Sequence, residues 1–247
     1  GGSRFYRNDG GTWIPESDEA WSKVGPVADA VMADVHGDVR PELVIASELG
    51  PLEVFSRTDQ GWVRLTESMG LAALDGWWNS VAVGDFNGDG RLDLVAGNRG
   101  RNSKAEIWGD GKVDIRWGEL DGSGTIALFE VASQGGQSHP LRDRRQLAVQ
   151  LPDIAARIPS HATFASTTIE GVVSRTAPPL SRSQASRLES MVLLNRGDRF
   201  EAHPLPREAQ WSPVLGIGVA DFDGDGAMDL ALAQNLFTVH PDDTRLD

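Results

Sequence analysis

Residues 79–96 read Asn79-Ser-Val-Ala-Val-Gly-Asp85-Phe-Asn-Gly-Asp-Gly-Arg-Leu-Asp93-Leu-Val-Ala96. The part before Asp85 alternates with a period near two, which is typical of a β-strand. The nine residues 85–93 then place oxygen-bearing side chains at positions 1, 3, 5 and 9, and glycine at positions 4 and 6. Because an apolar run follows Asp93, this stretch predicts a strand, an acidic loop and a second strand.

The acidic loop at residues 85–93 carries the groups that a calcium ion requires. Ca2+ takes six to eight hard oxygen ligands at about 2.3–2.6 Å. Glycine at positions 4 and 6 lets the chain wrap closely without a Cβ clash. The predicted ligands are the side chains of Asp85, Asn87, Asp89 and Asp93, together with the backbone carbonyl of Arg91.

The same template recurs at residues 221–229, with glycine again at positions 4 and 6. The predicted ligands there are the side chains of Asp221, Asp223, Asp225 and Asp229, and the carbonyl of Ala227. An EF-hand would need a glutamate at position 12 and helices on both sides. Position 12 is Ala96 in one loop and Leu232 in the other, and the flanks alternate as strands do.

Two further segments match the template in part. The weaker candidate ligands of the first are Asp34, His36, Asp38, Arg40 and Glu42. Val39 replaces the second glycine of this segment, and a β-branched residue resists positive φ. The other segment offers Glu119, Asp121, Ser123 and Thr125, but Ala127 removes the last carboxylate.

These four acidic segments predict an internal repeat. Their first acids, Asp34, Asp85, Glu119 and Asp221, are spaced by 51, 34 and 102 residues. Hairpin-like patterns precede three of them, at residues 5–13, 54–62 and 192–200, with turn residues that hairpins favour. A period of about 50 residues suits a four-stranded propeller blade. The predicted fold is therefore all-β, a β-propeller or a fragment of one.

A short helical insertion interrupts the repeats. Leu147, Leu151, Ile154 and Ile158 are spaced as one face of a helix, and Pro152 divides the segment into two short helices. The expected organisation is a first blade at 1–50, a second at 51–101, a degenerate third at 102–137, the helical insertion at 138–189 and an incomplete fourth blade at 190–247.

Composition narrows the class of protein. The formal net charge is −13, which argues against a nucleic-acid partner and suits a chain that gathers cations. The chain has no cysteine, so disulfides and thiolate metal sites are excluded. No apolar run approaches the roughly 20 residues needed to span a bilayer. No signal peptide is expected at its start, where Gly1-Gly2-Ser3-Arg4 leads directly into strand-like sequence.

The two full loops with their flanks, residues 81–95 and 218–231, resemble FG-GAP/VCBS repeats, which form integrin-α-like β-propellers. Residues 5–11 and 76–81 are similar to a bacterial cartilage-acidic-protein-like group. The resemblance implies a non-catalytic, secreted, cell-surface or periplasmic scaffold with structural calcium, used for protein contact or adhesion. Four repeats are fewer than the usual seven blades, so self-association through open blade edges is also expected.

Two other functions stay open on the sequence alone. A carbohydrate-binding propeller would use some of the eight tryptophans, although tryptophan more often fills the space between blades. A propeller lyase or hydrolase would need an acid, a base and an arginine at an axial pocket, and the sequence predicts no such group of residues. Arg196-Gly197-Asp198 matches a known integrin-binding tripeptide, but it falls where the repeat requires a hairpin turn.

Overall fold

The computed structural model describes residues 4–21, 24–104, 106, 111–120, 124–149, 151–173 and 178–235. It is mostly β, as the sequence predicted. The chain divides into two compact units: Gly1–Arg101 with Arg187–Asp247 form unit 1, and Asn102–Ser186 form unit 2. Within the described part, no helix is long and apolar enough to cross a membrane.

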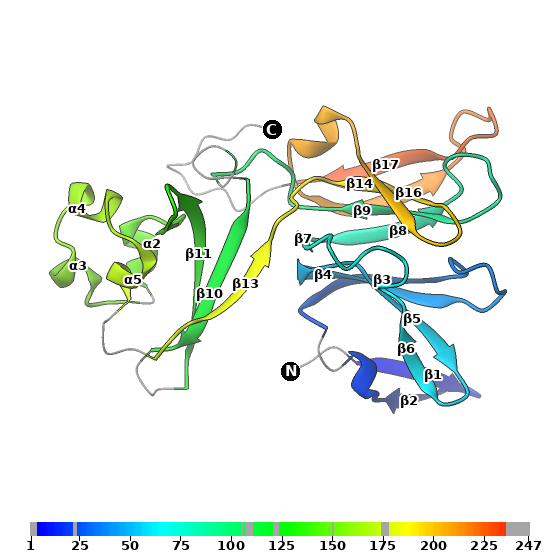
Figure 1. Cartoon of the computed structure of the whole chain (residues 1–247), viewed down its shortest axis with the longest axis horizontal. Helices are drawn as coiled ribbons and strands as arrows, with labels where there is room; N and C mark the ends of the chain where they lie inside the picture. Colours follow the sequence, from blue (N-terminus) through cyan, green and yellow to red (C-terminus); the bar gives the residue numbers. More distant parts are fainter. Residues whose placement is uncertain are drawn as a thin grey trace. The chain divides into compact units, whose positions relative to one another are not determined.

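Unit 1 is built from antiparallel strands and two short 3-10 turns (Figure 1). Its strands before unit 2 are β1 Phe5–Asp9, β2 Thr12–Glu16, β3 Val27–Ala33, β4 Glu42–Gly50, β5 Glu53–Thr58, β6 Gly61–Arg64, β7 Gly76–Trp77, β8 Ser80–Gly84 and β9 Asp93–Gly97. Its strands after unit 2 are β14 Met191–Asn195, β15 Phe200–Pro204, β16 Val214–Ala220 and β17 Asp229–Gln234, and the turns are η1 Glu19–Trp21 and η2 Arg207–Gln210.

These strands form two complete sheets and two strand pairs. One sheet has the order β3-β4-β5-β6, with β7 also pairing β4, and the other has the order β8-β9-β14-β15. Each complete sheet therefore consists of a strand, an acidic loop, a second strand and a hairpin. The pair β1-β2 is a hairpin alone, and the pair β16-β17 is two strands joined by an acidic loop.

Apolar side chains hold successive sheets face to face. Val44 and Val54 of one complete sheet share a buried cluster with Leu94 and Leu193 of the other. On the opposite face of the first sheet, Phe55 and Trp62 pack with residues of β1 and η1. Trp21, Trp62 and Trp78 lie in or against these clusters, as expected for tryptophans that fill the space between sheets.

Unit 2 is a four-stranded sheet covered by short helices. Its elements are β10 Val113–Glu119, β11 Ile126–Gln134, β12 Gln137–Pro140, β13 Ser181–Ala185, α2 Arg144–Ala148, α3 Ile154–Arg157, α4 His161–Ala165 and α5 Ile169–Val172, with the sheet order β12-β11-β10-β13. Leu147, Leu151, Ile154 and Ile158 are all buried against Phe129 and Val131, so the predicted helical face is the packed one. Pro152 lies in the turn between α2 and α3.

The structure groups the middle of the chain differently from the expected repeats. Residues 102–137 and 138–189 were expected to be a degenerate blade and a separate insertion, but their sheet and helices share one core in unit 2. Strands β14 and β15, expected to open the fourth blade, complete the sheet of β8 and β9. The physical reason is that strands pair where their apolar side chains match, however far apart they lie along the chain. In β9 and β14, Leu94 lies opposite Leu193 and Ala96 lies opposite Met191.

This arrangement explains the spacing of the loops. Asp85 and Asp221 are 136 positions apart, and leaving out the 85 residues of unit 2 reduces that interval to 51. The result equals the interval between Asp34 and Asp85. The interval of 102 residues from Glu119 to Asp221 is twice 51, but it does not represent two repeats, because Glu119 belongs to unit 2.

Candidate metal centre

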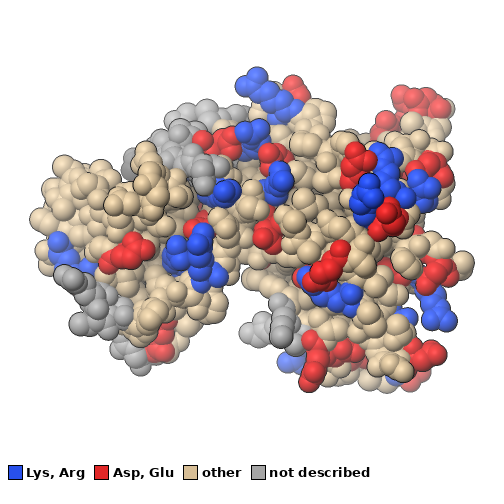
Figure 2. Space-filling model, in the orientation of Figure 1, with Lys and Arg blue, Asp and Glu red and all other residues tan. Residues whose placement is uncertain are grey.

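Three acidic loops of unit 1 emerge at the same end of their sheets (Figure 1). The first loop, residues 34–42, joins β3 to β4; the second, 85–93, joins β8 to β9; and the third, 221–229, joins β16 to β17. Strand β8 lies beside both β3 and β16, so the loops follow one another in series. Figure 2 shows acidic side chains, with basic ones among them, at this end of unit 1.

The first acid of each loop organises the backbone that follows it. Oδ1 of Asp85 accepts hydrogen bonds from the backbone N–H groups of Gly88 at 2.8 Å and Asp89 at 3.1 Å, and Oδ2 accepts one from Gly90 at 2.8 Å. Asp221 accepts the equivalent three bonds, and so does Asp34. The Gly90 N–H and the other backbone donors lower the pKa of Asp85, so its carboxylate is held ionised.

The backbone of the first loop matches the other two despite its altered sequence. Position 6 has a φ of 81° at Gly90 and 93° at Gly226, and Val39 takes the same place with a φ of 75°. A β-branched residue with positive φ is strained. The N–H of Val39 donates to Asp34 Oδ2 at 2.8 Å, so the carboxylate holds this conformation.

The last acid of each loop joins the loop back to its own start. Asp93 Oδ2 accepts from the N–H of Phe86 at 3.0 Å, and Asp229 Oδ2 accepts from Phe222 at 2.8 Å. Glu42 serves the first loop in the same way, accepting from Val35 at 3.1 Å. Asp93 and Glu42 are fully buried at the start of their strands, so these two carboxylates also lie at the edge of the core.

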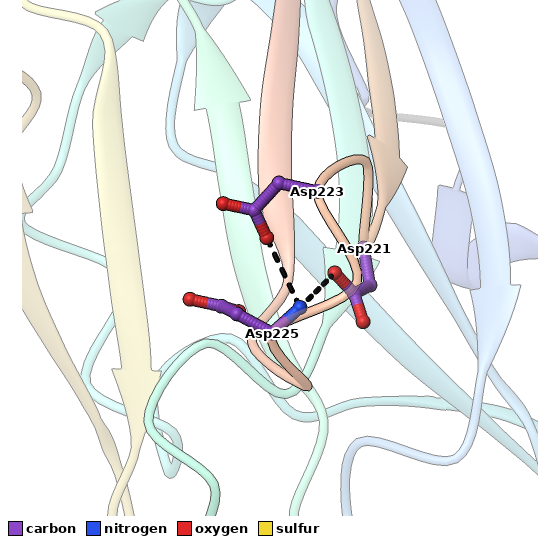
Figure 3. Close-up of side chains that lie close together, drawn as sticks. All are labelled: Asp221, Asp223 and Asp225. Carbon is purple, nitrogen blue, oxygen red and sulfur yellow. Dashed lines mark hydrogen bonds between the residues drawn. The ribbon is translucent and has the colours of Figure 1, made fainter.

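The third loop brings carboxylates closest together. Asp221, Asp223 and Asp225 each place one carboxylate oxygen within 4.8 Å of the others, and all three residues are exposed. Figure 3 shows the Asp221 and Asp223 side chains turned toward the backbone N–H of Asp225, which donates to both carboxylates at 3.1 Å. Like charges this close repel, and a bound cation would remove that repulsion. This all-oxygen donor set fits a hard divalent cation.

The second loop carries a basic side chain where the third has Ala227. The guanidinium of Arg91 pairs with the Asp89 carboxylate and donates from Nε to the carbonyl of Asn195 at 2.9 Å. Asn87 Oδ1 and Asp89 Oδ1 accept from the backbone two residues on, as Asp223 and Asp225 do. The second loop therefore has the same turns as the third, with a basic side chain beside its position 5.

Each of the two weaker segments keeps only part of the template. In the first loop, His36 stands at position 3, where an imidazole nitrogen replaces a hard oxygen. In the other segment, Glu119 Oε1 accepts from the N–H of Gly124 at 2.6 Å, and Gly124 has a φ of 79°. Asp121 and Ser123 lie outside the described residues.

One residue that sequence reasoning missed connects two of the loops. Asn195, at the end of β14, is buried and donates from Nδ2 to the carbonyl of Val35 at 2.8 Å and to that of Leu92 at 3.1 Å. The sequence signal that could have identified Asn195 was its position directly before Arg196-Gly197-Asp198, because an asparagine that ends a strand often forms a hydrogen bond with the backbone of the following turn. The tripeptide itself forms the β14–β15 turn, with Gly197 at a φ of 92°.

The fold and the loops define a class: a mostly-β repeat protein whose acidic loops join the first two strands of successive sheets. An FG-GAP-like repeat model matches residues 34–96, which include the first and second loops. Cartilage acidic protein 1 of Xenopus tropicalis is 25% identical over 231 residues, covering 88% of this chain and 29% of that protein. The chain thus spans less than a third of this curated relative. It carries FG-GAP-like repeat sequence, as its loops predicted.

Proposed function

We propose that this chain is a calcium-stabilised, extracytoplasmic scaffold of the β-propeller type that serves protein interaction or adhesion and not catalysis. The observation that carries the proposal is the shared geometry of the three loops. Each has a first acid that accepts from positions 4, 5 and 6 and a last acid that accepts from position 2. Such a loop is preorganised to present several oxygens at once.

Calcium would be held by the residues that the template names in the second and third loops. Bound there, it supplies positive charge and no redox or acid–base chemistry. The chain's own part is to place the first and last acids of each loop at the ends of two adjacent strands. A cation that neutralises these acids would hold the ends of the two strands together, so the proposed role is structural.

The propeller-type arrangement is supported by the order of strands in unit 1. Both complete sheets have the same order, and neighbouring sheets share apolar clusters through their faces. The FG-GAP-like match over residues 34–96 covers most of the first complete sheet and the start of the second. A location outside the cytoplasm is supported by the similarity to cartilage acidic protein 1.

Calcium titration tests the proposal directly. We expect calorimetry on chelator-treated protein to detect two sites, and Asp85→Ala and Asp221→Ala each to remove one of them. Excess chelator should lower the melting temperature, and calcium should restore it by linkage. Asp198→Ala removes an exposed aspartate from the β14–β15 turn, outside the loops, and should keep both sites. Absence of binding heat together with a melting curve unchanged by calcium would refute structural calcium.

A further inference from the structure

The second loop holds a positive charge of its own against one of its candidate ligands. The guanidinium of Arg91 pairs through Nη2 with the carboxylate of Asp89, which stands at position 5 of the loop. Its Nε donates at 2.9 Å to the backbone carbonyl of Asn195, at the end of β14. One arginine side chain therefore joins a candidate calcium ligand to a strand residue that lies 104 positions further along the chain.

The third loop has no such arrangement. Ala227 takes the place of Arg91, and among the described residues no basic side chain pairs with a carboxylate of this loop. The side chains at positions 1, 3, 5 and 9 are four carboxylates in the third loop, but three carboxylates and the amide of Asn87 in the second. With Arg91 included, the formal charge is −4 in the third loop and −2 in the second.

The first loop shows that an arginine at position 7 is not sufficient for this contact. Arg40 stands there, and its backbone N–H donates to Asp38 Oδ1 at 2.9 Å, as in the second loop. However, the Arg40 guanidinium forms no ion pair with any described residue. Arg91 differs because the carbonyl of Asn195 holds its side chain, and Asn195 is itself buried and hydrogen-bonded to both loops.

We propose that Arg91 is a positioned counter-cation that competes with calcium for Asp89 and keeps the calcium affinity of the second loop below that of the third. Calcium and the guanidinium carry charge of the same sign, so they repel each other within the loop. Calcium can use Asp89 only after the Arg91–Asp89 pair has opened, whereas the bond from Nε to the Asn195 carbonyl can remain. The inference rests on the proposed calcium function and specifies how one of its sites is regulated.

The same contact makes the second loop less dependent on calcium for its shape. Without calcium, Arg91 neutralises Asp89 and holds the loop against β14, which relieves part of the repulsion among its carboxylates. In the third loop, three carboxylates lie close together and no described basic side chain pairs with them. Added calcium should therefore slow amide exchange more in residues 221–229 than in residues 85–93. An equal change in the two loops would count against the counter-cation.

Calorimetry on the second site alone tests the competition. In an Asp221→Ala background only the second loop is expected to bind calcium, and adding Arg91→Gln removes the charge but keeps a long side chain with an amide donor. We expect calcium to bind about five- to tenfold more tightly in the Arg91→Gln chain, because one repulsion is removed and no ion pair has to open. The matched control is Arg199→Ala in the same background, which removes an exposed arginine from the β14–β15 turn and should leave the affinity unchanged.

Salt provides a second readout that a merely structural role of Arg91 would not affect. Screening weakens the repulsion between calcium and the guanidinium, so the affinities with Arg91 and with Arg91→Gln should approach each other as sodium chloride is raised. Thermal unfolding without calcium checks that Arg91→Gln remains folded, since exposed ion pairs contribute little to stability. Calcium binding that is unchanged or weaker in Arg91→Gln would overturn this inference and leave the proposed function intact. Absence of calcium binding in the natural chain would overturn both.

Discussion

The backbone N–H of Asn195 donates to Oδ1 of Asp93 at 2.7 Å, although 102 residues separate them in the chain. Asp93 ends the second loop, and the Asn195 side chain also donates to the carbonyls of Val35 in the first loop and Leu92 in the second. One buried residue on β14 therefore connects two acidic loops after the chain has passed through unit 2.

Asn195→Ala should destabilise unit 1 strongly. The substitution removes the side-chain hydrogen bonds to the carbonyls of Val35 and Leu92 and leaves those carbonyls without this donor. Unsatisfied buried groups cost about 1–3 kcal/mol each, so we expect a loss of about 2–4 kcal/mol in the free energy of unfolding. Urea unfolding measures it, with the exposed amide variant Gln60→Ala as control. A change of the same size in both variants would contradict the connecting role of Asn195.

Val39→Gly should stabilise the first loop. Val39 is 88% exposed and has a φ of 75°, so glycine relieves strain and loses little packing. Strain of about 1–3 kcal/mol, less the extra chain entropy of glycine, predicts a net gain of about 1 kcal/mol. Val39→Ala removes the β-branching but keeps a Cβ at positive φ, so its gain should be smaller. Thermal unfolding distinguishes the two variants, and an alanine variant as stable as the glycine variant would argue against backbone strain.

His36→Asp should add a third calcium site. The substitution places a hard oxygen at position 3 of the first loop, whose other hydrogen bonds already match those of the third loop. Calorimetry should then find three sites in place of the two that we propose for the natural sequence. His161→Asp, on an exposed position of α4, adds the same charge outside the loops and should leave the number of sites unchanged. An unaltered count in His36→Asp would mean that the first loop lacks more than this ligand.

Asp18 should contribute a pH-dependent part of the stability of unit 1. Its carboxylate accepts from the N–H groups of Ala20 at 2.9 Å and Trp62 at 3.2 Å, and these bonds lower its pKa below the usual value of 3.8. A lowered pKa stabilises the folded state above the unfolded value, and that stabilisation is lost as the pH falls through the folded pKa. Asp18→Ala should therefore be less stable than the natural chain near neutral pH, with the difference narrowing below pH 3.8. Parallel unfolding curves across this range would refute the assignment.

Unit 1 should fold without unit 2. The chain leaves and returns at adjacent points, because the N–H of Gly100 donates to the carbonyl of Leu188 at 2.8 Å. Replacing residues 102–186 by a short glycine–serine linker shortens the loop that must close between β9 and β14, which lowers its entropic cost. We expect a β-rich circular dichroism spectrum and a cooperative melt. A disordered product would show that the sheet of β8, β9, β14 and β15 requires unit 2.

The sequence by itself determined the local parts of this protein. Within each acidic loop, the hydrogen bonds from the loop's own N–H groups to its first and last acids span at most seven residues, as between Asp85 and Gly90 and between Phe86 and Asp93. Such bonds follow from residue type and spacing, so the loops, their flanking strands and the buried face of α2 and α3 could be predicted. The similarity of the first loop to the other two could not be predicted, because the Asp34 carboxylate holds Val39 at a positive φ that a β-branched residue disfavours.

Only the tertiary structure decided which strands belong together. The period of 51 residues is interrupted by an 85-residue unit with its own core, and β14 pairs with β9 across it. Pairing between distant strands depends on apolar register and on the contacts of buried residues such as Asn195, and neither leaves a periodic trace in the sequence.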